Sequence, residues 1–141
     1  MKITELFAPD AAPLTASRTD TDGDAPLTNP DIAGVTADSR QVQPGFLFVA
    51  LRGVATDGRR FAGEAVAKGA AAILTDDPAA LALEETARQR IAIITDPNPQ
   101  RRLALISSRI YPQRPGTIVA VTGTNGKTST AHFTREIWEA L

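Results

Sequence analysis

The sequence predicts an α/β fold with a mostly parallel β-sheet. Short apolar runs alternate along the chain with longer segments in which apolar residues recur at helical spacing. Strands that alternate with helices favour a parallel sheet, because each helix returns the chain to the end where the previous strand began. One run, "FLFVAL" at 46–51, is apolar throughout, which is typical of a strand buried on both faces.

The expected elements begin with a short helix at 4–7. Residues 8–30 follow without an apolar period and are rich in Pro, Asp, Thr and Ala, so we expect an extended or mobile loop. From Ile32 onward the expected elements are a strand starting at 32, a strand at 46–51, a helix within 57–70, a strand at 70–76, a helix at 77–90, a strand at 91–96, a helix at 99–111, a strand at 117–123 and a helix at 127–141.

Sequence signals mark the ends of two of these helices. Asp77 and Pro78 are an N-cap and first-turn pair for the helix at 77–90. The later helix starts near Pro99 and must stop before Pro112, because a proline disfavours helical backbone in the residue before it. Its apolar residues fall at three- and four-residue steps, so one of its faces is apolar.

The best domain boundary is the Pro- and Gly-containing turn at 112–116. Residues 1–112 hold enough alternating strands and helices for one compact α/β unit. Residues 113–141 hold one strand, one loop and one helix, which cannot bury their own apolar surface without further strands. We therefore expect 113–141 to be the incomplete start of a second domain, mobile or packed in a non-native way.

Composition excludes several classes of function. The formal net charge is −1, from 15 Lys and Arg against 16 Asp and Glu, so we expect no nucleic-acid partner. With no cysteine and one histidine, disulfides, thiolate metal sites and multi-histidine clusters are excluded. The N-terminus lacks the apolar core of a secretory signal, and no apolar run is long enough for membrane insertion. A cytoplasmic protein is expected.

A phosphate-binding loop is expected at "AVTGTNGKTSTA" (120–131), where a predicted strand meets a predicted helix. Gly123 and Gly126 let the backbone turn tightly and bring its N–H groups toward phosphate oxygens. Lys127 would reach the β- and γ-phosphates, and the Thr128 hydroxyl would bind Mg²⁺. The loop departs from the usual Gly-x-x-x-x-Gly-Lys-Ser/Thr pattern at its first position, where a valine stands.

Three blocks of sequence resemble the Mur ligase family, enzymes that add amino acids to UDP-N-acetylmuramic acid during peptidoglycan synthesis. "VAVTGTNGKTST" (119–130) is similar to the family's own form of the ATP loop, including its valine. "ADSRQVQPGFLFVALRGVATDGRRF" (37–61) resembles the N-terminal UDP-binding domain. "DPNPQRRLALISSRIYP" (96–112) resembles the segment before the ATP loop in the tripeptide-forming branch of the family.

The resemblance implies that the UDP part of the substrate lies against residues 1–112. The Ser39 hydroxyl would hydrogen-bond a pyrophosphate or ribose oxygen. Ala37 would pack near the uracil, and the backbone of residues 54–56 would hydrogen-bond the edge of the uracil. The UDP-sugar-binding residues that match the family are Ala37, Ser39, Arg40, Val54, Ala55 and Thr56.

The arginines near this site have two interpretations. Arg40 either serves the pyrophosphate charge or pairs internally with Asp38 or Asp57. Arg59 and Arg60 are expected on a solvated helix face.

The resemblance also implies ATP-dependent chemistry at the loop. Lys127 would be catalytic, neutralising the γ-phosphate as it moves to the substrate carboxylate and forms an acyl phosphate. An amine would then attack the acyl phosphate and give an amide, ADP and phosphate. Thr128 would be the Mg²⁺ ligand. The ATP-binding residues that match the family are Gly123, Thr124, Asn125, Gly126, Lys127, Thr128 and Ser129.

The tripeptide-forming branch implies three substrates, which are ATP, a UDP-N-acetylmuramoyl dipeptide and a diamino acid. The residues that select between meso-diaminopimelate and lysine lie outside this sequence, and we expect meso-diaminopimelate because 96–112 looks most like Gram-negative members. The family's Mg²⁺-binding glutamate and histidine, carbamylated lysine and amino-acid pocket lie downstream of the ATP loop. The 141-residue chain is therefore expected to be a monomeric N-terminal part of the ligase that is inactive alone.

Two other interpretations stay open. The chain could belong to the sister ligase that extends the tripeptide, which shares the Asp-Ser-Arg block. Residues 1–112 could instead be a stand-alone, non-catalytic UDP-sugar-binding module. A small independent P-loop hydrolase is disfavoured, because no acidic metal-binding strand follows the loop.

Overall fold

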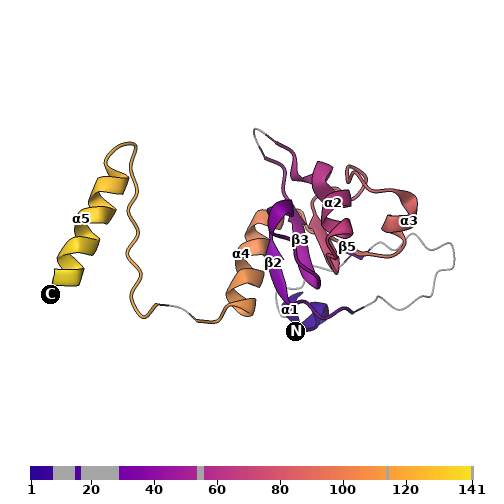
Figure 1. Ribbon diagram of the computed structural model, residues 1–141, viewed down its shortest axis with the longest axis horizontal. Coiled ribbons are helices and arrows are strands. Elements are labelled where there is room, and N and C mark those ends of the chain that lie inside the picture. Colours follow the sequence, from indigo (N-terminus) through magenta and orange to yellow (C-terminus); the bar gives the residue numbers. More distant parts are fainter. Residues whose placement is uncertain (8–14, 17–28, 54–55, 114, 141) are drawn as a thin grey trace.

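A five-stranded sheet forms the centre of the fold, shown in Figure 1. The computed structural model describes residues 1–7, 15–16, 29–53, 56–113 and 115–140. The strands are β1 (Thr15–Ala16), β2 (Gly34–Thr36), β3 (Phe46–Ala50), β4 (Ala72–Thr75) and β5 (Ala92–Thr95). The α-helices are α1 (Ile3–Phe7), α2 (Ala62–Ala67), α3 (Glu85–Arg88), α4 (Pro99–Ile110) and α5 (Lys127–Ala140), and two 3₁₀ turns are η1 (Ser39–Gln41) and η2 (Gly58–Phe61).

The strand order is β1-β5-β4-β3-β2. Strands β2 to β5 are parallel to one another, and β1 pairs with the edge of β5 in the antiparallel direction. The predicted α/β fold with a mostly parallel sheet is confirmed. The predicted strand at 46–51 is also confirmed as doubly buried, because residues 47–50 of β3 have no exposed surface.

Alternation along the strands builds two apolar layers, one on each face of the sheet. Leu47 and Val49 of β3 face α1 and α4, where they pack in one cluster with Phe7 and Ile106. Phe48, between them in sequence, points to the opposite face, whose cluster includes the buried alanines of α2. Side chains of a strand alternate between faces, so one continuous apolar run fills both layers.

Helix α4 begins and ends as the sequence predicts, and its buried apolar face lies against the sheet. Asn98 caps its N-terminus by accepting a hydrogen bond from Arg101 N at 2.9 Å. Arg102 of this helix is buried, and its Nε donates to Asp96 Oδ2 at 2.6 Å. Its guanidinium also lies 5.5 Å from the centre of the Phe7 ring. These contacts join α4, α1 and the end of β5.

The predicted helix at 77–90 is wrong in extent, because only Glu85–Arg88 is helical. Asp77 does cap a turn, since its carboxylate accepts hydrogen bonds from the amides of Ala79 and Ala80. The chain then leaves the helical path because its backbone groups bond elsewhere. Arg88 donates to the carbonyls of two residues in the segment, Pro78 and Leu81.

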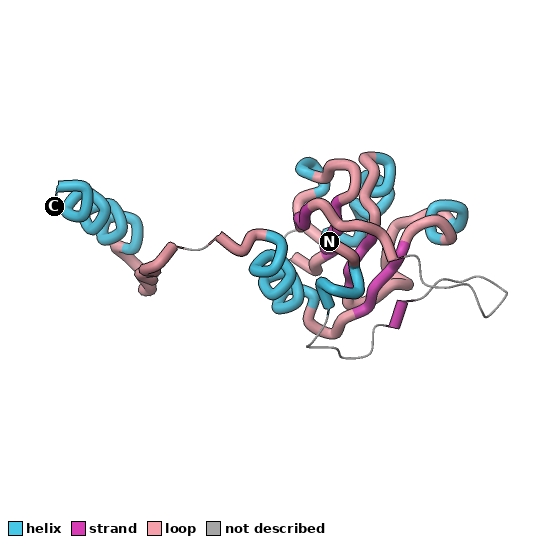
Figure 2. Tube along the Cα trace, turned by 90° about the horizontal axis from the view of Figure 1, so that it is seen from below, coloured by secondary structure: helices cyan, strands magenta, loops and turns pink. Residues whose placement is uncertain are grey.

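Two further expectations are corrected. Most of the loop expected at 8–30 lies outside the described residues, but residues 15–16 form β1, and Asn29 accepts a hydrogen bond from Thr4 N at 3.1 Å. The strand expected at 117–123 does not form, because no strand within the described ranges pairs with it. Figure 2 shows this segment and α5 lying apart from the sheet.

Candidate functional site

A pocket of about 600 Å³ lies where the chain leaves β2 and β3. In parallel α/β sheets, ligands bind beyond the carboxyl ends of the strands, which is where these two segments lie. The lining residues are Ala37, Asp38, Ser39, Arg40, Leu51, Gly53, Thr56, Gly58, Phe61 and Glu64.

The structure brings four of the six predicted UDP-sugar residues to this one pocket. Ala37, Ser39 and Arg40 come from the segment after β2, and Thr56 comes from the loop after β3. The other two, at 54–55, lie outside the described residues. Their role in binding stays a prediction.

Ser39 lies in a small network of hydrogen bonds. Its side chain is buried, and its Oγ donates to Glu64 Oε2 at 3.0 Å. Lys68 Nζ donates to Glu64 Oε1 at 2.7 Å and to the Ser39 carbonyl at 3.0 Å. The bond from Lys68, and then that from Ser39, lowers the pKa of the Glu64 carboxyl. Sequence reasoning missed Glu64 and Lys68, although their four-residue spacing on a helix signals a pair.

Arg40 forms the internal pair that the sequence left open. Its Nε lies 2.9 Å from Asp38 Oδ1 and its Nη2 lies 2.7 Å from Asp38 Oδ2. Hydrogen bonds from the Arg40 side chain and backbone lower the pKa of Asp38 to about 2. The Arg40 side chain is nevertheless 84% exposed, so it stands at the rim of the pocket.

The expectation that Arg59 is solvated is wrong. Arg59 is buried, and its guanidinium lies 2.6 Å from Asp57, 3.6 Å from Asp76 and 3.7 Å from Asp77. The cause is the 3₁₀ turn η2, which starts the helix and directs Arg59 toward the carboxylates after β4 rather than outward. Arg60 is exposed, as expected.

The loop after β3 is closed by backbone contacts. Gly58 N donates to Leu51 O at 2.8 Å, and Arg52 pairs with Asp57 in an isolated β-bridge. A Cβ at position 58 would lie 2.7 Å from the Leu51 carbonyl oxygen, so only glycine permits this approach. The loop that carries Thr56 is therefore held at both ends.

The two Asp–Arg pairs predict a loss of stability in acid. Arg40 lowers the pKa of Asp38, and Arg59 lowers that of Asp57, each from 3.8 to about 2. A lowered folded-state pKa stabilises the protein above the unfolded pKa, and this contribution is lost as the pH falls. We expect the urea midpoint to fall between about pH 4 and pH 2.

The measurement is urea denaturation at closely spaced pH values, with Asp57→Asn as the test variant. Asp57→Asn should have a lower midpoint at pH 6 and a shallower fall below pH 4. A variant whose acid profile is parallel to that of the unchanged protein would contradict the assignment.

The turn that the sequence predicts to bind phosphate leads into α5 and contains two glycines in left-handed backbone conformations. Gly126 has φ +77° and Gly123 has φ +143°, values that side chains other than glycine rarely adopt. Lys127 Nζ donates to the carbonyl of Gly123 and, at 3.4 Å, to that of Thr124. The lysine is thus folded over its own loop.

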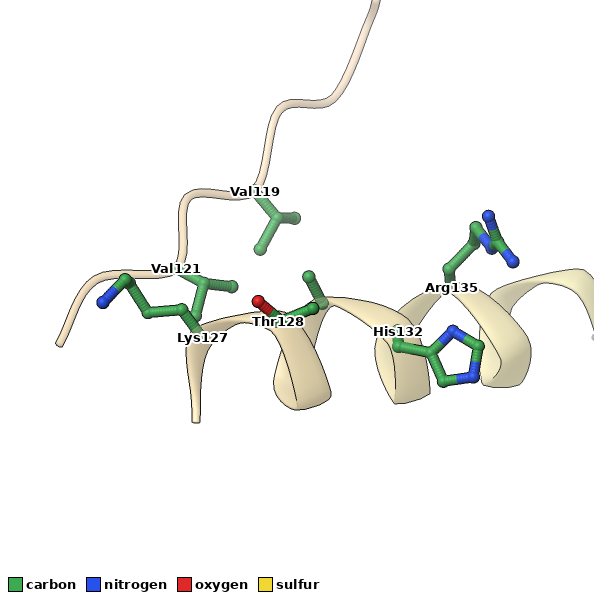
Figure 3. Close-up of a pocket in the computed structure, with 7 residues that line it drawn as sticks. Val119, Val121, Lys127, Thr128, His132 and Arg135 are labelled. Atoms are coloured by element: carbon green, nitrogen blue, oxygen red, sulfur yellow. The ribbon is translucent and has the colours of Figure 1, made fainter. Parts of the chain in front are cut away.

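A second hollow of about 620 Å³ lies beside this loop, as Figure 3 shows. Val119 and Val121 face the first turns of α5, with Thr128 between them and the helix axis. His132 lines the same hollow, and its Nε2 lies 3.0 Å from Glu136 Oε1. The side chains that line this hollow are exposed.

Magnesium fits this loop only together with other ligands. Across the described residues no group of three His, Cys, Asp or Glu side chains is placed to hold a metal ion. Thr128 offers one hydroxyl beside the loop. Mg²⁺ usually keeps several waters and takes phosphate oxygens as ligands, so one hydroxyl is compatible with an ion that arrives with a nucleotide.

The fold and the pocket define a class, an α/β domain with a pocket beyond the carboxyl ends of neighbouring parallel strands. The family follows from comparison with known proteins. The model described as "Mur ligase family, catalytic domain" matches residues 31–111. The chain belongs to the Mur ligase family, so the resemblance seen in the sequence is confirmed.

Similar proteins carry consistent names. A UDP-N-acetylmuramoyl-L-alanyl-D-glutamate–2,6-diaminopimelate ligase of Bradyrhizobium diazoefficiens is 44% identical over 100% of this chain and 26% of its own length. The ligase of the same name from Caulobacter vibrioides is 47% identical over 81% of this chain and 22% of its own. A solved structure with that name has a TM-score of 0.60 and 28% identity over 86% of this chain and 24% of its own.

The chain spans about a quarter of the length of these curated relatives. Within the described ranges, no helix has both the length and the apolar character needed to cross a membrane.

Proposed function

We propose that this chain is the UDP-sugar-binding part, with the ATP loop, of a ligase that joins meso-diaminopimelate to UDP-N-acetylmuramoyl-L-alanyl-D-glutamate. The observation that carries the proposal is the 44% identity over the whole chain, pocket and loop included, to a relative with that name. The pocket around Ser39 supports it, because it gathers polar groups from both segments that the resemblance assigns to UDP.

The proposed reaction has two steps at the phosphate loop. An oxygen of the substrate carboxylate attacks the γ-phosphorus of ATP, and ADP leaves. The amine of the diamino acid then attacks the carbonyl carbon, and phosphate leaves as the amide forms. Lys127 would leave the Gly123 carbonyl, extend to the γ-phosphate and neutralise its developing charge. Mg²⁺ would screen the phosphates, with Thr128 as one of its ligands.

The chain alone would not complete this reaction. The described residues include no cluster of acidic or histidine ligands for a second metal contact, and the loop stands on an unpaired segment. The proposal places the ligase in the cytoplasm, as the family resemblance implies, and treats the chain as a monomer.

Binding of UDP to the 141-residue chain tests the proposal. We expect saturable binding in calorimetry, and Ser39→Ala should weaken it about tenfold because one buried polar contact is lost. Ser107→Ala is a matched control, because it changes the same side chain on α4, outside the pocket. Absence of UDP binding up to millimolar concentrations would refute the proposal.

A non-catalytic UDP-sugar-binding module is a second candidate. It is favoured by one observation, that the described lining residues of the pocket all fall between 37 and 64 and none comes from the phosphate loop. The two candidates differ in their expected use of ATP. If the protein is a binding module, UDP-sugar binding is not coupled to ATP hydrolysis in any longer form of the protein. If it is a ligase, the longer protein requires that coupling.

The amino acid added is the finest part of the proposal. A relative from Roseiflexus, 44% identical over 82% of this chain and 22% of its own length, is named only as a UDP-N-acetylmuramyl-tripeptide synthetase. The other names specify diaminopimelate, which supports that choice. Offering the longer protein either the UDP-dipeptide or the UDP-tripeptide separates the proposed ligase from its sister enzyme.

A further inference from the structure

The hydrogen bonds around Ser39 fix the direction in which its hydroxyl is used. Ser39 Oγ lies 3.0 Å from Glu64 Oε2. An ionised carboxylate has no hydrogen to donate, so the single hydroxyl hydrogen of Ser39 points to Glu64. The lone pairs of the Ser39 oxygen are left to accept a hydrogen bond from a ligand in the pocket.

Lys68 holds this arrangement in place. It donates to the other Glu64 oxygen at 2.7 Å and to the Ser39 carbonyl at 3.0 Å. Lys68 therefore links the end of α2 to the segment after β2 and keeps Glu64 ionised and oriented. Ser39 is only 7% exposed, yet both Ser39 and Glu64 line the pocket.

We propose that Glu64 is a specificity-determining residue that makes this wall of the pocket a receptor for the ribose diol of the UDP group. The inference rests on the proposed function. Ser39 Oγ and the Glu64 carboxylate are neighbouring acceptors, and the two adjacent ribose hydroxyls are neighbouring donors. Acidic side chains accept hydrogen bonds from ribose hydroxyls in the same way in dinucleotide-binding sheets.

The other parts of UDP do not fit this wall. Diphosphate oxygens only accept hydrogen bonds, so they have no hydrogen to donate to the Glu64 carboxylate or to the Ser39 oxygen. The uracil imide has one N–H between two carbonyl oxygens, and these would face the carboxylate. The diphosphate instead belongs at the rim, where the Arg40 side chain is 84% exposed. Of the two contacts expected for the Ser39 hydroxyl, the inference therefore favours the ribose over the pyrophosphate.

The test compares UDP with 2′,3′-dideoxy-UDP in calorimetric titrations of the 141-residue chain. We expect the unchanged chain to bind UDP at least about tenfold more tightly than the dideoxy compound. Glu64→Ala should remove most of this ratio by weakening UDP, while the affinity for the dideoxy compound stays within about twofold. Glu64→Gln keeps the shape of the side chain and should also lower the ratio, because its amide N–H competes for the Ser39 lone pairs.

Glu85→Gln is the matched control, an exposed glutamate on α3 outside the pocket, and should leave both affinities unchanged. Thermal melts followed by circular dichroism check that each variant is folded. Equal binding of the two ligands by the unchanged chain, or an unaltered ratio in both Glu64 variants, overturns the inference and leaves a UDP pocket standing. Failure of the unchanged chain to bind UDP overturns the proposed function as well.

Discussion

Replacing Lys127 by alanine in a ligase that contains this chain should lower ATP-dependent amide formation roughly 10²–10³-fold. Lys127 is the first residue of α5, and its ammonium can reach the γ-phosphate. The glycines of the turn before it have no side chain that could supply a positive charge. Its loss removes charge stabilisation that matters most in the transition state. The measurement is initial-rate formation of the UDP-tripeptide, separated by chromatography.

Two controls give this result its meaning. Lys2→Ala, at an exposed lysine that pairs with Asp31 at 2.8 Å, should keep the full rate. The 141-residue chain alone should form no product. A Lys127→Ala enzyme with an unchanged kcat would remove the loop from the chemistry, and turnover by the short chain would refute its dependence on further residues.

Asp96→Ala should destabilise the domain by about 3–5 kcal/mol. Asp96 is buried and accepts hydrogen bonds from Arg102 Nε at 2.6 Å and from Asn98 N at 2.7 Å. It therefore holds the turn before α4 and pairs with an arginine of that helix. Its removal takes away the carboxylate that accepts a hydrogen bond from the buried Arg102 Nε. Small domains have total stabilities of about 5–15 kcal/mol, so this loss should be plain in urea unfolding at neutral pH.

A double variant separates the buried charge from the packing. Asp96→Ala combined with Arg102→Met removes both charges, and it should recover part of the lost stability because an apolar side chain then replaces the buried guanidinium. Asp31→Ala breaks an exposed pair and should shift the midpoint far less. If Asp96→Ala and Asp31→Ala had equal effects, the buried pair would not have the role assigned to it.

Local patterns predicted β3, β4 and β5 well because these strands are short, mostly apolar and bounded by turn residues. The strand at 46–51 illustrates this, because a strand without polar residues is expected to be buried on both faces of the sheet. The helix at 77–90 failed for the opposite reason. Its sequence favours a helix, but Arg88 bonds the carbonyls of Pro78 and Leu81 and holds the chain in turns. Such tertiary contacts are invisible to local periodicity.

The candidate site was likewise predicted in part, with some of its residues found from the sequence and others missed. Family resemblance placed Ser39, Arg40 and Thr56, and the structure gathers them in one pocket. It did not point to Glu64, because an i,i+4 pair on a helix normally signals a solvated face. Arg59 was predicted to be solvent-exposed because a charged residue on a helix normally lies on a solvated face. Its burial depends on carboxylates that follow β4 and lie 17 and 18 positions further along the chain, at 76 and 77.

The two residues of β1 have a consequence for how the domain meets other chains. Thr15 pairs with Thr95 and Ala16 with Ile94, so the outer edge of β5 already has a backbone partner there. An apolar parallel strand with an open edge is a template for pairing with another molecule. Strand β1 occupies that template at two positions, and there it keeps the edge of β5 from pairing with another molecule.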